Sequence, residues 1–119
     1  EVEIDLSVNA YIPDYYIDDE LIKLEMYKKI ACIENKDDLA EVQYELEDRF
    51  SDIPKPVETL LNIAYIKSMC KKLKIEKVRQ VKNEIILYPL TRYKTKETMG
   101  HKIVKELEEL LEKMLKLNN

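Results

Sequence analysis

Hydrophobic and polar residues alternate at the start of the chain. The even positions from 2 to 10 are apolar and the odd positions between them are polar, which predicts a half-buried β-strand ended by Pro13. Segments 18–33, 38–50 and 56–73 repeat apolar residues every three or four positions, which predicts three helices. Two short segments, 75–81 and 84–88, have the pattern of strands and are joined by a two-residue turn, which predicts a β-hairpin.

The last segment of the chain predicts a long amphipathic helix that starts between Thr98 and Lys102. Its apolar residues are spaced alternately by four and three: Ile103, Leu107, Leu110, Met114 and Leu117. A strand, three helices, a short hairpin and a long C-terminal helix predict an α+β fold. A length of 119 residues suits one compact domain over 1–119.

Two features of the first predicted helix carry further expectations. It has apolar residues around its whole circumference, one stripe containing Leu21 and Leu24 and another containing Met26 and Ile30, which indicates packing on two sides. The acidic residues at 14 and 18–20 do not have the spacing of a calcium loop and have no glycine for its sharp turn. Capping of the helix start explains them better than a cation site.

The composition excludes several kinds of catalytic site. Gly100 is the only glycine, so the glycine-rich loops that hold phosphates and dinucleotides are absent, and His101 has no companions spaced as metal ligands. We therefore expect no catalytic residue, no cofactor and no metal, and a chain that is not an enzyme. Cys32 and Cys70 lie in helical patterns and are expected to be buried, reduced thiols of a cytoplasmic protein. No signal peptide and no run of bilayer length is found, so no membrane partner is expected.

The stretch 44–56, YELEDRFSDIPKP, contains an acidic cluster on the second predicted helix. One side of this helix carries the core stripe Leu39, Val42, Leu46 and Phe50. The opposite side carries Glu41, Tyr44, Glu45 and Asp48. The cluster is therefore predicted to face solvent. It is either a solvated helix face with an i,i+4 pair between Glu45 and Arg49, or a contact patch centred on Tyr44, Glu45 and Asp48.

A basic cluster follows the third predicted helix. Its members are Lys71, Lys72, Lys74, Lys77, Arg79 and Lys82. Lysines in the last turn of a helix complement its dipole, and the same residues suit a patch that contacts phosphates. A nucleic-acid-binding accessory module that uses segment 71–82 is therefore the alternative function, although the net charge of −4 argues against nucleic-acid binding by the domain as a whole.

Residues 2–78 resemble, in one collinear register, the C-terminal domain of the bacterial transcription-repair coupling factor (Mfd) family. The segments that carry the resemblance are YIPDYYI, LEMYKKIA, ELEDRF, IPKPVETLL and KKLKIEKV. The chain departs from the family pattern at Ser51 and Lys74, where members usually have glycine. Segment 89–99 is also shorter than in the family, which indicates a trimmed or missing segment there.

The resemblance implies a regulatory role. The parent of this family is an ATP-dependent DNA translocase that removes stalled RNA polymerase and recruits the repair protein UvrA. Its C-terminal domain packs on a UvrB-like N-terminal module and so masks the surface that UvrA would use. The acids of the matching helix face arginines of that module, and the corresponding positions here are Glu45 and Asp48. Other parts of the parent bind RNA polymerase and DNA.

Overall fold

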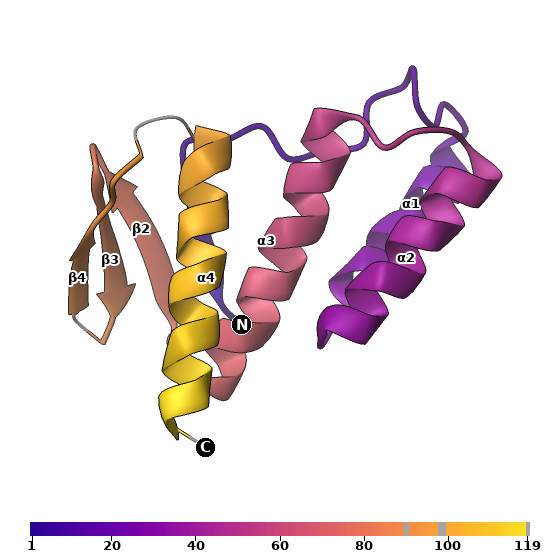
Figure 1. Cartoon of the computed structure of the whole chain (residues 1–119). Coiled ribbons are helices and arrows are strands. Elements are labelled where there is room, and N and C mark those ends of the chain that lie inside the picture. Colours follow the sequence, from indigo (N-terminus) through magenta and orange to yellow (C-terminus); the bar gives the residue numbers. More distant parts are fainter. Residues whose placement is uncertain (90, 98–99, 119) are drawn as a thin grey trace. The chain divides into compact units, whose positions relative to one another are not determined.

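The structure, a computed structural model, describes residues 1–89, 91–97 and 100–118. Its elements are β1 (Glu3–Asp5), α1 (Glu20–Ala31), α2 (Lys36–Arg49), α3 (Lys55–Lys72), β2 (Lys77–Val81), β3 (Glu84–Tyr88), β4 (Thr91–Lys94) and α4 (Gly100–Asn118) (Figure 1). Among the described residues, helices and one mixed sheet occupy separate parts of the chain, which confirms the α+β class.

The chain divides into two compact units. The helical unit is Asn9–Tyr65, and the sheet unit combines Glu1–Val8 with Ile66–Asn119. The assignment of 1–119 to one domain stays a prediction. The expected gap in segment 89–99 stays a prediction too, since residues 90, 98 and 99 lie outside the described residues.

The starts of α1 and α2 are capped by side chains, and the cap of α1 is among those that the sequence predicts. A carboxylate oxygen of Asp19 accepts hydrogen bonds from the backbone N–H groups of Leu21 and Ile22 at 2.9 and 3.0 Å. The Asn35 side chain accepts from the backbone N–H of Asp38 at 2.8 Å. These bonds satisfy amide groups that have no partner within the helix, and they fix where each helix begins.

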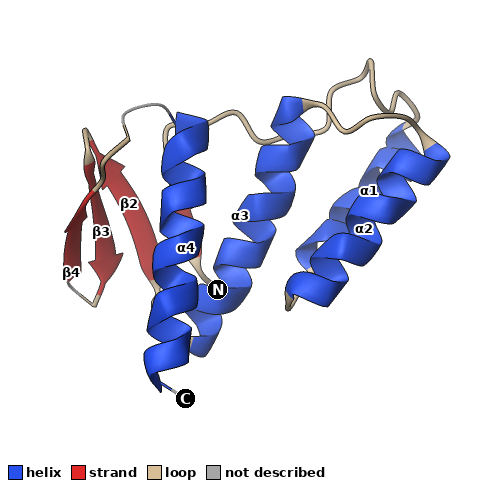
Figure 2. Cartoon of the chain, in the orientation of Figure 1, coloured by secondary structure: helices blue, strands red, loops and turns tan. Residues whose placement is uncertain are grey.

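The prediction that the first helix packs on two sides is wrong. In α1, Met26 and Ile30 are buried, but Leu21 is 79% exposed and Leu24 is 51% exposed. α1 contacts α2 in the helical unit, and the two helices lie side by side in Figure 2. Apolar residues on all sides of a helix do not by themselves determine how many neighbours it packs against. The number of its neighbours depends on the tertiary fold.

The segment before α1 is attached to both helices of this pair. The backbone N–H of Ile12 donates to the Tyr27 hydroxyl oxygen of α1 at 2.8 Å. The Tyr16 hydroxyl lies 3.2 Å from the carbonyl oxygen of Leu46 and 2.9 Å from that of Ser51, at the end of α2. These hydrogen bonds help to hold the C-terminal end of α2, which carries the acidic cluster.

The sheet unit contains a four-stranded sheet in the order β1-β2-β3-β4. β1 is parallel to β2, with Glu3 opposite Lys77, and the other neighbours are antiparallel. β3 has the predicted bounds, and the predicted turn joins it to β2, with Lys82 at φ 56°. β1 is shorter than predicted, although residues 1–8 keep the alternation of exposed and half-buried positions. β4 was not predicted, because four largely polar residues give no clear pattern.

α4 lies along one face of this sheet. Val78 and Leu87 are fully buried, and Tyr93 shares their face, because it pairs with Ile85. The Tyr93 side chain is hydrogen-bonded to Glu106 of α4, and Figure 2 shows α4 alongside the sheet. The apolar residues that α4 buries are Ile103, Val104, Leu107 and Leu111. Leu117, which the predicted stripe included, is instead 87% exposed.

Two backbone positions in the sheet unit depend on local geometry. A Cβ on Gly100 would lie 2.5 Å from the carbonyl oxygen of Ser7, so only glycine fits at the start of α4. Lys74 has φ 63° after α3, and Ile75 N–H donates to the Cys70 carbonyl oxygen at 2.8 Å. This is a Schellman-type helix end, a position where glycine avoids the cost of the left-handed conformation.

Candidate protein interface on the second helix

The structure confirms the predicted orientation of α2 for most of the acidic cluster. Leu39 and Leu46 are buried, whereas Glu41 and Asp48 are exposed and Tyr44 is 65% exposed. The apolar stripe therefore contributes to the core of the helical unit. The tyrosine and two of the predicted acidic residues lie on its surface.

Glu45 is half-buried, whereas the sequence predicts that it is fully exposed. Its side chain is 29% exposed, and its Oε2 atom accepts from the Lys29 ammonium group at 2.7 Å and from Arg49 at 2.8 Å. The predicted pair between Glu45 and Arg49 is present, but the contact with α1 could not be expected from the sequence of α2. Glu45 is therefore a bridge between two helices as well as a member of the acidic face.

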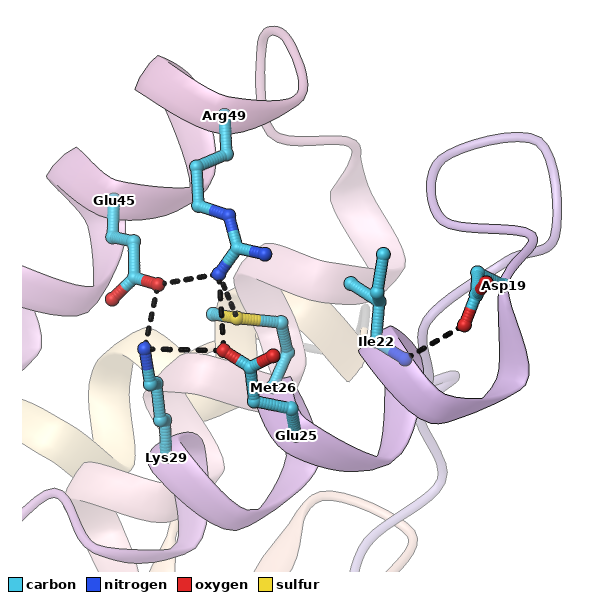
Figure 3. A network of polar contacts seen from close by, with 7 residues as sticks. All are labelled: Asp19, Ile22, Glu25, Met26, Lys29, Glu45 and Arg49. Carbon is cyan, nitrogen blue, oxygen red and sulfur yellow. Dashed lines mark hydrogen bonds and ion pairs between the residues drawn. The ribbon is translucent and has the colours of Figure 1, made fainter.

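A second carboxylate completes this bridge. Glu25 of α1 lies 3.1 Å from Arg49 and 3.4 Å from Lys29, so two carboxylates and two cations alternate in one cluster (Figure 3). We call Glu25, Lys29, Glu45 and Arg49 the bridging cluster. Hydrogen bonds from Lys29 and then Arg49 lower the pKa of Glu45, and bonds from Arg49 and then Lys29 lower the pKa of Glu25.

Arg49 points towards α1 and makes several contacts inside the helical unit. Besides its two carboxylate partners, its NH1 atom lies 3.7 Å from the Met26 sulfur, as Figure 3 shows. Its guanidinium carbon lies 5.1 Å from the centroid of the Phe50 ring, and that ring packs against Tyr16. Arg49, which is also a candidate interface residue, therefore makes these contacts within the helical unit while its side chain stays 34% exposed.

Sequence reasoning missed Glu25 and Lys29. The i,i+4 spacing of these two residues was the one available signal, because such pairs are neighbours on a helix surface. Nothing in the sequence relates them to Glu45 or Arg49, which lie on another helix. The pairing depends on how α1 and α2 pack.

Shallow hollows border Tyr44. One is lined by Ala40, Glu41, Tyr44, Glu45 and Asp48, and another by Ala40, Gln43, Tyr44, Glu47 and Asp48. The small side chain of Ala40, one helical turn before Tyr44, leaves space beside the ring. The face therefore presents an aromatic ring between acidic residues, which suits contact with another protein surface better than enclosure of a small molecule.

The basic residues proposed for the alternative function are not gathered on one element. Lys71 and Lys72 are in the last turn of α3, and Lys74 follows that helix. Lys77 and Arg79 are on β2. All are exposed except Lys77, which is half-buried, pairs with Glu3 at 3.0 Å and lies over the Tyr88 ring.

The two cysteines differ in their surroundings. Cys70 is buried, as expected, and burial raises the pKa of its thiol to about 12. Cys32, also expected to be buried, is exposed at the end of α1. Both are free thiols, and burial protects only Cys70.

Other kinds of site find no support in the described ranges 1–89, 91–97 and 100–118. No group of three or more histidine, cysteine, aspartate or glutamate side chains is placed there to hold a metal ion. No helix among these residues is long and apolar enough to cross a membrane.

Comparison with known proteins assigns the family. The TRCF domain family matches residues 6–99. The transcription-repair-coupling factor of Staphylococcus epidermidis is 34% identical over 110 residues, which are 92% of this chain and 9% of that protein. That of Bacillus subtilis is 37% identical over 87 residues, 73% of this chain and 7% of that protein. The chain thus spans less than a tenth of the length of these relatives.

A solved structure agrees with both the fold and the family. The crystal structure of the C-terminal domain of a transcription-repair coupling factor matches with a TM-score of 0.70 and 41% sequence identity. The match covers 72% of this chain and 53% of the other. The family match over most of the chain and the identity to its relatives lead to one conclusion: this chain belongs to the TRCF domain family of the transcription-repair coupling factors.

Proposed function

We propose that this chain is a regulatory, non-catalytic interaction domain of a cytoplasmic coupling factor. It packs on the UvrB-like N-terminal module of its parent and covers the surface that UvrA would bind. The parent is then the ATP-dependent DNA translocase, and its other parts bind RNA polymerase and DNA. The observation that carries the proposal is the exposed face of α2, where Tyr44 lies between the exposed acids Glu41 and Asp48.

The charge of the helical unit supports a basic partner. Asn9–Tyr65 contains 14 aspartate and glutamate residues and six lysine and arginine residues, a net charge of −8. Such a surface attracts a basic protein surface and repels nucleic acid. Exposed ion pairs contribute only about 0–1 kcal/mol each. A clasp made of them holds because tethering within one protein supplies a high effective concentration, and it opens when competing contacts favour another state.

The test replaces Glu45 and Asp48 together by alanine. The 119-residue chain should stay folded, and its affinity for the purified N-terminal module should fall at least about threefold at low salt. The affinity of the unchanged chain should itself weaken as salt rises, because exposed charges are screened over about 8–10 Å at physiological ionic strength. In the full-length parent, the double substitution should let UvrA bind without RNA polymerase.

The control reverses the charge of Lys71 and Lys72, which should alter this affinity much less. Binding that is abolished by the lysine changes and unaffected by the acidic ones would contradict the proposal.

A second candidate function, contact with nucleic acid through segment 71–82, is favoured by one observation. The sheet unit contains 14 lysine and arginine residues and 10 acids, a net charge of +4, although the whole chain is negative. Binding of a fluorescent DNA duplex, measured against salt, tests it. Each phosphate contact that is lost should reduce the slope of log affinity against log salt by about 0.9. Replacement of Lys71, Lys74 and Arg79 by glutamate should therefore flatten that slope. An unchanged slope would exclude this segment as the nucleic-acid contact.

A further inference from the structure

The acids on the exposed face of α2 are not equivalent in charge. The bridging cluster contains two carboxylates and two cations, joined by four ion pairs of 2.7 to 3.4 Å, so its net charge is zero. Figure 3 shows these pairs. Glu45 is therefore already compensated inside the helical unit. By contrast, within the described part of the chain, Glu41, Glu47 and Asp48 form no ion pair. These three residues therefore carry negative charge on this face that no ion pair compensates.

Tyr44 lies at the centre of that uncompensated charge. Its ring is exposed, and its hydroxyl has no hydrogen bond with any residue that the structure describes. Ala40 lies one helical turn before it and Asp48 one turn after it, and the hollows beside the ring have acids in their walls. An exposed tyrosine keeps two side-chain torsions and offers a large apolar ring, so ordering it on binding costs little entropy.

We propose that Tyr44 is the anchor of the contact, flanked by Glu41 and Asp48, and that Glu45 contributes little to binding. The partner surface that fits has an apolar recess for the ring, bordered by arginine or lysine side chains that pair with the two acids. Such anchors in protein interfaces are enriched in tyrosine and concentrate the binding energy, while charges around them set orientation and association rate. This inference rests on the proposed function, because it takes the N-terminal module as the partner.

The neutral cluster also explains why Glu45 belongs to the architecture of the domain. Its Oε2 atom accepts from both Lys29 and Arg49, and a partner's arginine would have to share or displace these internal donors. Asp48 has no such competitor among the described residues. Although the two acids are three residues apart on one helix, removal of their charges should have different effects.

The experiment measures the affinity of single variants of the 119-residue chain for the purified N-terminal module by calorimetry at low salt. Tyr44→Ala should weaken binding by about tenfold or more, and Tyr44→Phe should stay within about threefold of the unchanged chain, because the ring supplies the contact. Asp48→Asn should weaken binding by about threefold, the scale of one exposed charge pair. Glu45→Gln should differ by less than about twofold from the control variant Asp18→Asn, which removes the same charge from an exposed site outside α2.

Thermal unfolding of each variant shows whether a change in affinity comes from the fold. Tyr44→Ala and Asp48→Asn should melt like the unchanged chain, since both side chains are exposed, while Glu45→Gln should melt slightly lower because it loses its pairs with Lys29 and Arg49.

Two results would overturn the inference and leave the proposed function intact: tight binding by Tyr44→Ala, or a loss in Glu45→Gln as large as that in Tyr44→Ala. If the unchanged chain does not bind the N-terminal module at all, the proposed function fails, and this inference fails with it.

Discussion

The helical unit and the sheet unit are of similar size but carry opposite charge. Asn9–Tyr65 has a net charge of −8, whereas Glu1–Val8 with Ile66–Asn119 has +4. The formal charge of the whole chain, −4, is the sum of these two values and hides both. The single value of −4 would suggest a chain that is weakly acidic throughout. Charge counted for each compact unit instead predicts different partner classes for the two.

The largest expected effect tests whether α2 is correctly oriented in the helical unit. Leu46→Ala should lower the free energy of unfolding by about 2–5 kcal/mol, because Leu46 is fully buried and its truncation leaves a cavity. Its neighbour Glu45 is the matched control. Glu45→Ala should cost less than about 1 kcal/mol, since partly exposed ion pairs contribute little. Equal losses in urea unfolding of the two variants would mean that the two sides of α2 have been confused.

A smaller effect of opposite sign is expected in the sheet unit. Lys74→Gly should stabilise the chain by about 1 kcal/mol, because Lys74 has φ 63° and glycine adopts this conformation without strain. Lys67→Gly, an exposed position inside α3, should instead destabilise by about 1 kcal/mol. The pair of variants separates a local backbone effect from loss of a lysine charge, which is common to both. A destabilising Lys74→Gly would exclude the left-handed helix end.

A pH effect smaller again is expected in the helical unit. The pKa values of Glu25 and Glu45 lie below the ordinary value of 4.5 because of their cationic partners. Their contribution to stability is therefore fully present above that value and is lost as the pH falls through the lowered pKa values.

Amide exchange in α1 and α2, compared between about pH 6 and about pH 3 after correction for intrinsic rates, should show this loss of protection. In a Glu25→Gln, Glu45→Gln double variant the loss should be smaller. The same pH response in that variant and in the unchanged chain would show that the bridging cluster does not link α1 to α2.

The last prediction concerns reactivity and requires no change in stability. Each unit contains one cysteine, and an alkylating reagent should modify exposed Cys32 in the folded chain but not buried Cys70. Mass spectrometry of the native chain should show one modification, and unfolding in urea should expose the second thiol. Rapid modification of both native thiols would contradict the burial of Cys70.

The elements with a clear period were predictable from the sequence, and contacts between elements were not. The helices were expected within a few residues of their observed bounds, because their apolar residues repeat every three or four positions. β3 was expected at its observed bounds, because it is a short apolar segment that follows a turn. β4 was missed because TRYK is short and mostly polar. The family resemblance indicated that the position of Lys74 is usually a glycine, and the structure shows a positive φ there.

The candidate interface shows the same division. Helical spacing predicted that Tyr44 and Asp48 are exposed, because that depends only on which side of α2 is apolar. It also placed Glu45 on the exposed side, but this side chain is half-buried and also pairs with α1, which was not predicted. The partners of Glu45 come from α1, and their distance depends on helix packing that no local pattern encodes.

The parallel pairing of β1 with β2 has a consequence for the order of folding. Glu3 lies opposite Lys77, so the whole of Asn9–Tyr65 is inserted in the connection between two neighbouring strands. During synthesis, the segment that contains β1 leaves the ribosome before β2 and has no partner until β2 follows. Closing so long a loop is entropically costly and slow, whereas the contact between α1 and α2 is local in sequence. The helical unit should therefore fold on the ribosome before β1 pairs with β2 and joins the sheet.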